Sequence, residues 1–401
     1  MTTELLLRLG LRIQSPLLLL RAMGFRHYQS RLVLALAFVL GIIGAAAQDE
    51  RSLEAVDLDT TLSLDKLAAQ LGTQRVVFVG ESHNRYDHHL NQLAIIRRLH
   101  QLDPSLAIGV EYFQQPFQSQ VDDYIAGRTT EREFLRSTEY YQGWGYDYRL
   151  YAPIFRFARE QRIPVRALNV PSDLPSAVAK VGIAGLSGQQ RAYLPREIGP
   201  ADEAYRGRLR RAFEAHKATK SEAFDHFVEA QQVWDEGMAE SAAAYLNENP
   251  SRRIVILAGS GHVEYGDGIP KRLERRTKAT YSIVLNSSDE VGPHMADYLL
   301  LSKEQELPAA GILGISLEEK NVGCRIRSLN PKGAAEKAGL KKGDILVGID
   351  GQTVNRIADM HLSLWDKHPG EHVLVRVRRK GRSGAGSERS FEVELAAAVK
   401  S

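Results

Sequence analysis

Apolar and polar positions alternate along residues 55–302 in a way that predicts strands and helices in turn. Strand-length apolar runs occupy residues 75–79, 105–110, 163–171, 253–258, 281–285 and 297–301. Between them, apolar residues recur at helical spacing at 62–71, 88–102, 114–137, 151–161 and 200–249, and again after Pro270. Buried strands that alternate with helices predict an α/β domain in which helices cover both faces of a mostly parallel sheet.

The longest helical pattern, residues 221–246, predicts a helical insertion that roofs a site on this domain. One face of that helix carries residues spaced three or four positions apart, namely Gln231, Trp234, Asp235 and Met238. Taken alone, this spacing favours an ordinary helix with Trp234 and Met238 in the core and Asp235 as a surface charge.

After the polar stretch 303–308, the pattern changes to short strands separated by glycine turns, which predicts a small β-rich domain over residues 308–398. Its motifs resemble those of PDZ domains, and they are Ala338-Gly339-Leu340, Gly343-Asp344 and Asp350-Gly351. In that family a loop binds a peptide's carboxylate and the peptide adds to a sheet edge, which implies a peptide or protein C-terminus as partner. The matching loop is Leu313-Gly314-Ile315. A helix from Ile357 to about residue 368 would form the opposite wall, with candidate lining residues Met360, Leu362 and Leu364.

A signal peptide is predicted for residues 1–47. Basic residues at 26–31 precede an apolar run at 32–44, and small residues at 45–47 supply a cleavage site, for which Met23 would be a more usual start. The apolar run is shorter than the roughly 20 residues that cross a bilayer, so we expect no retained membrane span and a periplasmic or secreted protein. Cys324, the only cysteine, cannot form an intramolecular disulfide, and no cysteine near the cleavage site could carry a lipid.

Length and charge limit the remaining possibilities. A chain of 401 residues is long enough for two folded domains and a targeting segment. Its 52 basic and 49 acidic residues give a net charge of +3, which supplies no electrostatic reason to expect nucleic-acid binding.

Ionisable side chains follow three of the predicted strands, and this coincidence is the main functional signal of the sequence. Glu81 and His83 end the first strand, Glu111 ends the second, and His262 ends the fourth after three small residues. Ligands of open parallel sheets bind beyond the carboxyl ends of strands, so we expect two carboxylates and two imidazoles in one pocket. These four side chains could bind a divalent metal ion or perform acid–base chemistry without one. Each residue alone would more simply cap a helix or satisfy a loop.

Other residues near these strand ends have simpler expected roles. His88 and His89 begin the helix 88–102 and are expected on its surface. The aromatic run 140–148 is expected to form a loop, whose rings either pack on the domain or face the pocket.

The strand-end motifs resemble those of the ChaN family of haem-binding uptake proteins. The resemblance covers about residues 60–302 and rests on the segments 79–83, 111–113, 231–239, 259–262 and 265–270, in that order. It implies a periplasmic protein that holds haem between two subunits of a homodimer, with a tyrosine as iron ligand. Tyr112 and Tyr265 are the candidate tyrosines, and further candidates for contact with haem are His83, His262 and Trp234.

The wider superfamily leaves a second function open. It includes erythromycin-esterase-like hydrolases and the Tiki metalloproteases, which share the first Glu-x-His pattern and the late Gly-x-His pattern. In an enzyme of that kind the catalytic residues would be Glu81, His83, Glu111 and His262, with a divalent metal ion in place of haem. A third interpretation is an envelope scaffold with a vestigial pocket. We expect haem or iron binding first and a metal-dependent peptidase or other hydrolase second, which leaves open whether the protein is an enzyme.

Overall fold

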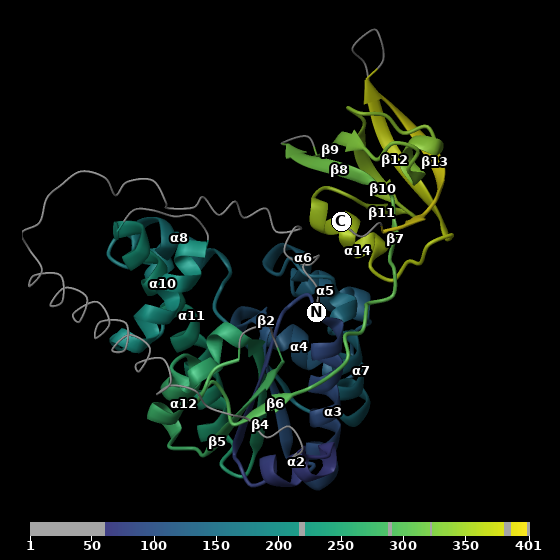
Figure 1. Cartoon of the computed structure of the whole chain (residues 1–401). Coiled ribbons are helices and arrows are strands. Elements are labelled where there is room, and N and C mark those ends of the chain that lie inside the picture. Colours follow the sequence, from purple (N-terminus) through teal and green to yellow (C-terminus); the bar gives the residue numbers. More distant parts are fainter. Residues whose placement is uncertain (1–60, 216–220, 288–290, 321–322, 381–385, 399–401) are drawn as a thin grey trace, which may run out of the picture. The chain divides into compact units, whose positions relative to one another are not determined.

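Six parallel strands form the sheet of the first domain, in the order β3-β2-β4-β1-β5-β6 (Figure 1). They are β1 Val76–Glu81, β2 Leu106–Gln114, β3 Val165–Asn169, β4 Arg253–Gly259, β5 Tyr281–Asn286 and β6 Tyr298–Leu300. The parallel sheet expected from the sequence is therefore confirmed. The computed structural model describes residues 61–215, 221–287, 291–320, 323–380 and 386–398, so the signal peptide predicted for residues 1–47 lies outside the described residues.

Helices cover both faces of this sheet. They are α2 Leu64–Leu71, α3 Tyr86–Leu102, α4 Gln118–Ile125, α5 Glu131–Ser137, α6 Tyr140–Gly143, α7 Ala152–Gln161, α8 Asp173–Val181, α9 Gly188–Arg191, α10 Glu203–Ala215, α11 Ser221–Glu248 and α12 Ile269–Thr277. Val77 and Val79 of β1 face a core shared with α2, α3, α4 and α7, whereas Val76 and Phe78 face a core shared with α11 and α12. Because neighbouring strand residues point to opposite faces, an unbroken apolar run is what a doubly covered strand requires. Within the described ranges, no helix is long and apolar enough to cross a membrane.

Local signals explain several element ends. The Thr130 hydroxyl accepts a hydrogen bond from the Glu133 backbone N–H, and the Glu133 carboxylate accepts one from the Thr130 N–H. This reciprocal cap starts α5 and confirms the break expected before it.

Other segments differ from expectation. β2 runs on through Glu111 and Tyr112, which the sequence places after the strand. The aromatic run 140–148 contains the short helix α6, and α8 and α9 occupy a region for which the pattern predicts no element.

An antiparallel sheet forms the C-terminal domain, in the order β13-β12-β10-β9-β8. Its elements are β7 Gly311–Ile312, β8 Ile315–Lys320, β9 Gly323–Leu329, α13 Ala334–Lys337, β10 Ile345–Ile349, β11 Gln352–Thr353, α14 Ile357–Leu364, β12 His372–Lys380, β13 Gly386–Glu394 and β14 Ala396–Ala397. Among the described strands β8 pairs with β9 alone, so its other edge is open to a further strand. Cys324 is buried in the core of this domain, where its thiol is inert.

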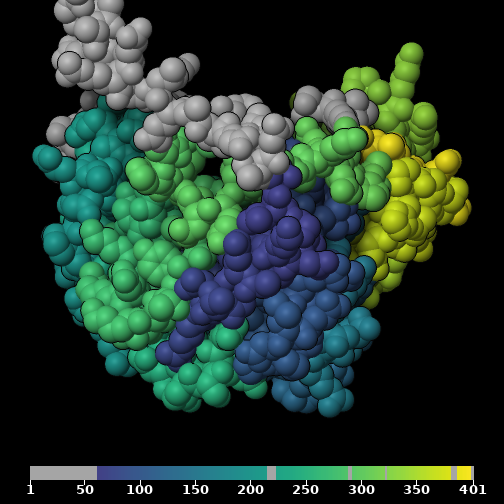
Figure 2. All heavy atoms as spheres, turned by 60° about the horizontal axis from the view of Figure 1, so that its bottom comes forward, coloured from purple at the N-terminus to yellow at the C-terminus, as the bar shows by residue number. Residues whose placement is uncertain are grey.

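The C-terminal domain packs through α14 against α5 and α6. Arg132 of α5 donates hydrogen bonds to the Leu362 carbonyl at 2.9 Å and to the Asp366 carboxylate at 3.1 Å. Figure 2 shows this domain, in yellow, directly against blue residues of the first domain. The Leu362 side chain joins the core of the first domain, so the expectation that it lines the peptide groove is wrong.

Candidate functional site

The carboxyl end of β1 places Glu81 and His83 against each other. Glu81 is the last residue of the strand, and its buried Oε1 lies 2.5 Å from His83 Nδ1. The side chain of His83 is 24% exposed, so this pair reaches solvent on one side. The other carboxylate oxygen, Glu81 Oε2, is buried without a hydrogen-bond partner.

His88 and His89 are buried, which corrects the expectation that they lie on the helix surface. The Ser82 backbone N–H donates a hydrogen bond to His88 Nδ1 at 3.0 Å. Burial lowers the pKa of His88, which keeps the ring neutral and able to accept this bond. His89 Nε2 lies 3.2 Å from the His83 carbonyl oxygen. The first turn of α3 therefore holds residues 81–83 in position.

Glu111 lies inside β2 and links the ends of the neighbouring strands. Its Oε2 accepts a hydrogen bond from the Gly259 backbone N–H at 2.7 Å, and its Oε1 lies 3.5 Å from His262 Nε2. Gly259 lets the imidazole of His83 approach closely, because an added Cβ would lie 2.9 Å from its Cε1 and would displace the ring. The structure thus brings Glu81, His83, Glu111 and His262 together, while the roles assigned to them stay predictions.

Asp235 of α11 belongs to this site, although the sequence favoured a surface charge there. It is 1% exposed, and its Oδ1 lies 2.7 Å from His262 Nδ1. Its Oδ2 accepts a hydrogen bond from the Tyr205 hydroxyl, also at 2.7 Å. A signal was present, since two adjacent acidic residues interrupt the mostly apolar run 233–239 of a helix that covers the sheet. Trp234 packs edge-on against His262, with ring centroids 5.9 Å apart.

Arg208 of α10 secures the loop that carries His262. Its guanidinium donates a hydrogen bond to the Gly261 carbonyl at 2.7 Å and forms ion pairs with Glu264 and Asp267. The helical insertion therefore contributes a side chain that fixes the loop after β4.

Both histidines of the site bind a proton more strongly than a free imidazole does. Burial works against protonation of His262, but the charges of Glu111 and Asp235 outweigh it and raise the pKa of His262 to about 9. Burial also opposes protonation of His83, whereas the Glu81 hydrogen bond and the Glu111 charge raise its pKa above the usual value. Near neutral pH, His262 is therefore an imidazolium held between two carboxylates.

The two candidate tyrosines lie in different environments. Tyr112 points away from Glu111 into the core, where its ring packs against Tyr151 with centroids 4.1 Å apart, and it is 3% exposed. Burial raises the pKa of Tyr112 well above its usual value. Its phenol is neither accessible nor readily ionised, so as placed it does not fit the role of iron ligand. Tyr265, three residues beyond His262, is 42% exposed.

Aromatic rings from the run 140–148 flank His83. The ring centroids of Trp144 and Tyr146 lie 4.8 and 4.9 Å from that of His83. Trp144 Nε1 donates a hydrogen bond to the Tyr151 hydroxyl at 3.1 Å, and this hydroxyl donates to the His83 carbonyl at 3.2 Å. Tyr146 is 37% exposed and forms part of the rim of the site.

The side chains of the site are already engaged with one another. Carboxylates face Nδ1 of both His83 and His262, and Glu111 Oε2 is bonded to a backbone N–H. In the part of the chain that the structure describes, no three histidine, cysteine, aspartate or glutamate side chains are arranged to hold a metal ion. A divalent metal at these residues therefore stays a prediction.

A parallel α/β domain with histidines and carboxylates at its strand ends, followed by a β-rich domain with an open sheet edge, defines the class of protein. The model of the haem-binding uptake family ChaN, of the Tiki superfamily, matches residues 67–273, and the PDZ domain model matches residues 311–395. The first match covers just over half of the chain, so this protein belongs to the ChaN family, and a PDZ domain follows. A comparison with curated proteins returned no match.

Several solved structures are similar to parts of the chain. ChaN of Campylobacter jejuni, in a structure of cofacial haem binding, is 18% identical with a TM-score of 0.49, over 60% of this chain and 92% of that one. The HtrA-type protease AlgW with a decapeptide is 18% identical with a TM-score of 0.21, over 23% of this chain and 31% of that one. The serine endoprotease from Yersinia pestis is 19% identical with a TM-score of 0.20, over 23% of this chain and 30% of that one. The chain spans less than a third of the length of these two proteases.

Proposed function

We propose that this protein is exported and binds haem through its ChaN-type domain, while its PDZ domain docks a peptide or protein C-terminus. The main support is family membership over residues 67–273, together with aromatic and imidazole groups that reach solvent at the strand ends. We therefore place the haem site at the carboxyl ends of the parallel strands, where ligands of such sheets bind.

The side chains at this edge suit a flat aromatic group with a central iron. Trp144 and Tyr146 offer ring surfaces beside His83, and Tyr265 is a partly exposed tyrosine, whose phenol oxygen is a donor that suits ferric haem. We assign Tyr265, rather than the buried Tyr112, as iron ligand. His262 is 12% exposed and faces a carboxylate at each ring nitrogen. We therefore assign His262 and Trp234 to holding the loop after β4 in position rather than to direct contact with haem.

Titration with ferric haem tests this assignment. Tyr265→Phe removes the phenol oxygen and keeps the ring, so the affinity for haem should fall about tenfold or more and the absorption spectrum of the complex should change. Tyr193→Phe is the matched control, because Tyr193 is also exposed, at 51%, and lies outside the site. If the parent protein showed no saturable spectral change, haem binding would be contradicted. If Tyr265→Phe bound haem as the parent does, only the assignment of Tyr265 as iron ligand would be contradicted.

Export and dimerisation belong to the same proposal. The charge and hydropathy pattern of residues 1–47 supports export, and the family resemblance supports haem held between two copies of the chain. Mass spectrometry of the protein recovered from the periplasm should show a mature chain that begins near residue 48. Sedimentation should show a dimer that haem promotes, and a monomer at every haem concentration would contradict the dimer.

The PDZ domain is proposed to bind a free chain end by strand addition. The open edge of β8 lies across a cavity from α14, and Gly314 in the preceding loop has φ 68°, a conformation that favours glycine. Ile315, Ile357 and Leu364 line the cavity, so an apolar last residue suits it.

A hydrolase is the second candidate, and the paired histidines favour it. Glu81 faces Nδ1 of His83 at 2.5 Å and Asp235 faces Nδ1 of His262 at 2.7 Å, as in sites where a carboxylate orients a histidine acid or base. With Nδ1 engaged, Nε2 of His83 is the atom that would transfer a proton to or from a substrate, whereas Nε2 of His262 faces Glu111. Peptide or ester cleavage that metal stimulates and His83→Ala abolishes would support this function. Absence of cleavage with and without added zinc would count against it.

A further inference from the structure

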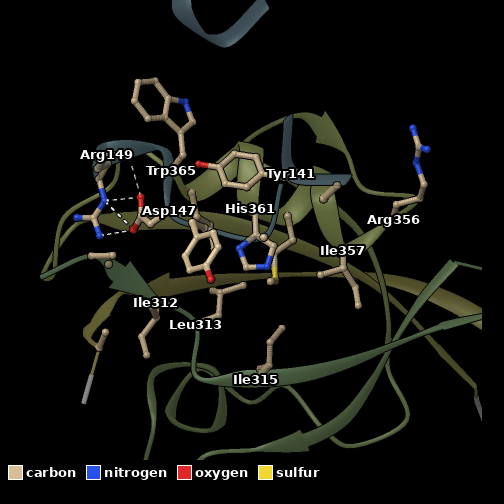
Figure 3. A pocket seen from close by; sticks show the side chains of 18 of the residues that line it. Tyr141, Asp147, Arg149, Ile312, Leu313, Ile315, Arg356, Ile357, His361 and Trp365 are labelled. Atoms are coloured by element: carbon tan, nitrogen blue, oxygen red, sulfur yellow. Dashed lines mark hydrogen bonds and ion pairs between the residues drawn. The ribbon is translucent and has the colours of Figure 1, made fainter. Parts of the chain in front are cut away.

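A cavity of about 900 Å³ extends the peptide groove onto the first domain (Figure 3). On the PDZ side, Figure 3 shows Leu313 and Ile315 across the cavity from Ile357 and His361. On the side of the first domain, the lining comes from the segment 141–149, which we call the aromatic wall. A PDZ groove is complete without such a wall, so its presence requires a separate explanation.

The aromatic wall is attached to the groove by specific contacts. The Tyr141 ring stacks on that of His361, with centroids 5.6 Å apart and an interplanar angle of 25°. Arg149 Nη1 donates a hydrogen bond to the Pro308 carbonyl at 2.8 Å, in the segment that leads into the PDZ domain. The Arg356 guanidinium donates to the Gln142 side chain. Both ends of the wall are therefore tied to the elements that shape the groove.

The same segment is attached to the strand-end site. Trp144 and Tyr146 line the cavity, and their rings also lie against His83. The Tyr140 hydroxyl donates a hydrogen bond to the Tyr146 carbonyl at 3.1 Å, which holds the backbone of the wall against the core. Trp144 and Tyr146 thus belong to both sites at once.

We propose that the peptide site is composite, and that a peptide end bound in the groove contacts the aromatic wall and thereby changes the surroundings of His83. The occupant is a free peptide C-terminus with an apolar last residue, because the open edge of β8 accepts a strand and the groove lining is apolar. An aromatic residue further from the peptide's end suits the wall, since aromatic rings pair favourably. This inference rests on the peptide docking proposed above and is independent of haem. If bound peptide changes the affinity for a ligand at His83, linkage requires that this ligand change the affinity for peptide by the same factor.

Binding of defined peptides to the full mature chain tests the composite site. The probes are ten-residue peptides with free carboxyl ends, each with a tyrosine in its last five positions and valine, leucine, isoleucine or phenylalanine as last residue. The same peptides with amidated ends should not bind. Gly145→Trp should weaken binding about tenfold or more, because Gly145 lines the cavity and the indole would occupy space that the peptide needs. The fold should tolerate this change, since an added Cβ at position 145 meets nothing within 4 Å. Gly188→Trp is the matched control, since Gly188 has equally open surroundings and lies outside the cavity.

The composite site would be overturned if none of these peptides bound, or if Gly145→Trp bound them as tightly as the parent. The coupling is measured on haem-free protein labelled with 13C-histidine. Saturating peptide should shift the Cε1–H signal of His83, because the His83 ring lies beside those of Trp144 and Tyr146. The corresponding signal of His100 should not change. An unmoved His83 signal at saturation would overturn the coupling. Neither experiment contains haem. The peptide affinities and the shift of the His83 signal can therefore be interpreted even if the protein does not bind haem.

Discussion

Replacement of Asp235 by asparagine removes the charge that faces His262 while it keeps the size of the side chain. Asp235 Oδ1 lies 2.7 Å from His262 Nδ1. Together with Glu111, it raises the pKa of His262 from 6.5 to about 9. A rise of this size corresponds to ~3 kcal/mol of folding free energy. Because the folded pKa is above the unfolded one, this stabilisation is complete below pH 6.5 and is lost as the pH rises through about 9.

We therefore expect Asp235→Asn to destabilise the protein by ~1 kcal/mol above about pH 9.5, where only hydrogen bonds are weakened, and by up to ~4 kcal/mol near pH 6. Urea unfolding at both pH values measures this difference, and NMR titration of the His262 Cε1–H signal measures its pKa. Asp344→Asn is the control: Asp344 is also 1% exposed but pairs with Arg379 in the PDZ domain, so the His262 titration should not change. The reasoning is refuted if parent and Asp235→Asn lose stability equally with rising pH, or if His262 of the parent titrates near its usual pKa.

Three further substitutions test particular contacts. Gly259→Ala should displace His83 and weaken haem binding about tenfold or more. Gly261→Ala is the control and should bind haem as the parent does, because its added Cβ meets nothing within 4 Å. If the two variants gave the same haem titration, the close approach of Gly259 to His83 would be contradicted. Tyr112→Phe removes a buried hydroxyl that has no hydrogen-bond partner, so urea unfolding should show a stability within about 1 kcal/mol of the parent or higher, and a larger loss would contradict this environment. Arg132→Ala removes contacts to Leu362 of α14 and to Asp366 just beyond it, so hydrogen exchange of the α14 amides should accelerate while that of β1 stays the same. Unchanged exchange in α14 would show that these contacts do not hold the domains together.

The sheet and part of the site could be predicted because their signals are local. An apolar run without alternation, such as residues 76–79, marks a strand covered on both faces. Ionisable residues just after such runs lie at one edge of a parallel sheet, which is how Glu81, His83 and His262 come together.

The rest depends on packing between segments far apart in the sequence. Asp235 joins the site because α11 packs against β3 and α12, which brings its side chain to His262 in the loop after β4. Helical spacing alone does not show this contact. Glu111 and Tyr112 are adjacent, but both lie inside β2, so they point to opposite faces and only Glu111 reaches His262. The contact of the aromatic wall with α14 likewise depends on how the PDZ domain packs, which its own motifs do not specify.

The central claim, that the strand-end site binds haem, is tested most directly by an absorption titration of ferric haem into the mature protein. We predict a saturable change of the Soret band that Tyr112→Phe retains and that Tyr265→Phe weakens or alters. A titration of the parent without a saturable change would contradict haem binding at this site. If Tyr112→Phe lost the Soret change and Tyr265→Phe kept it, the iron ligand would be Tyr112 and not Tyr265.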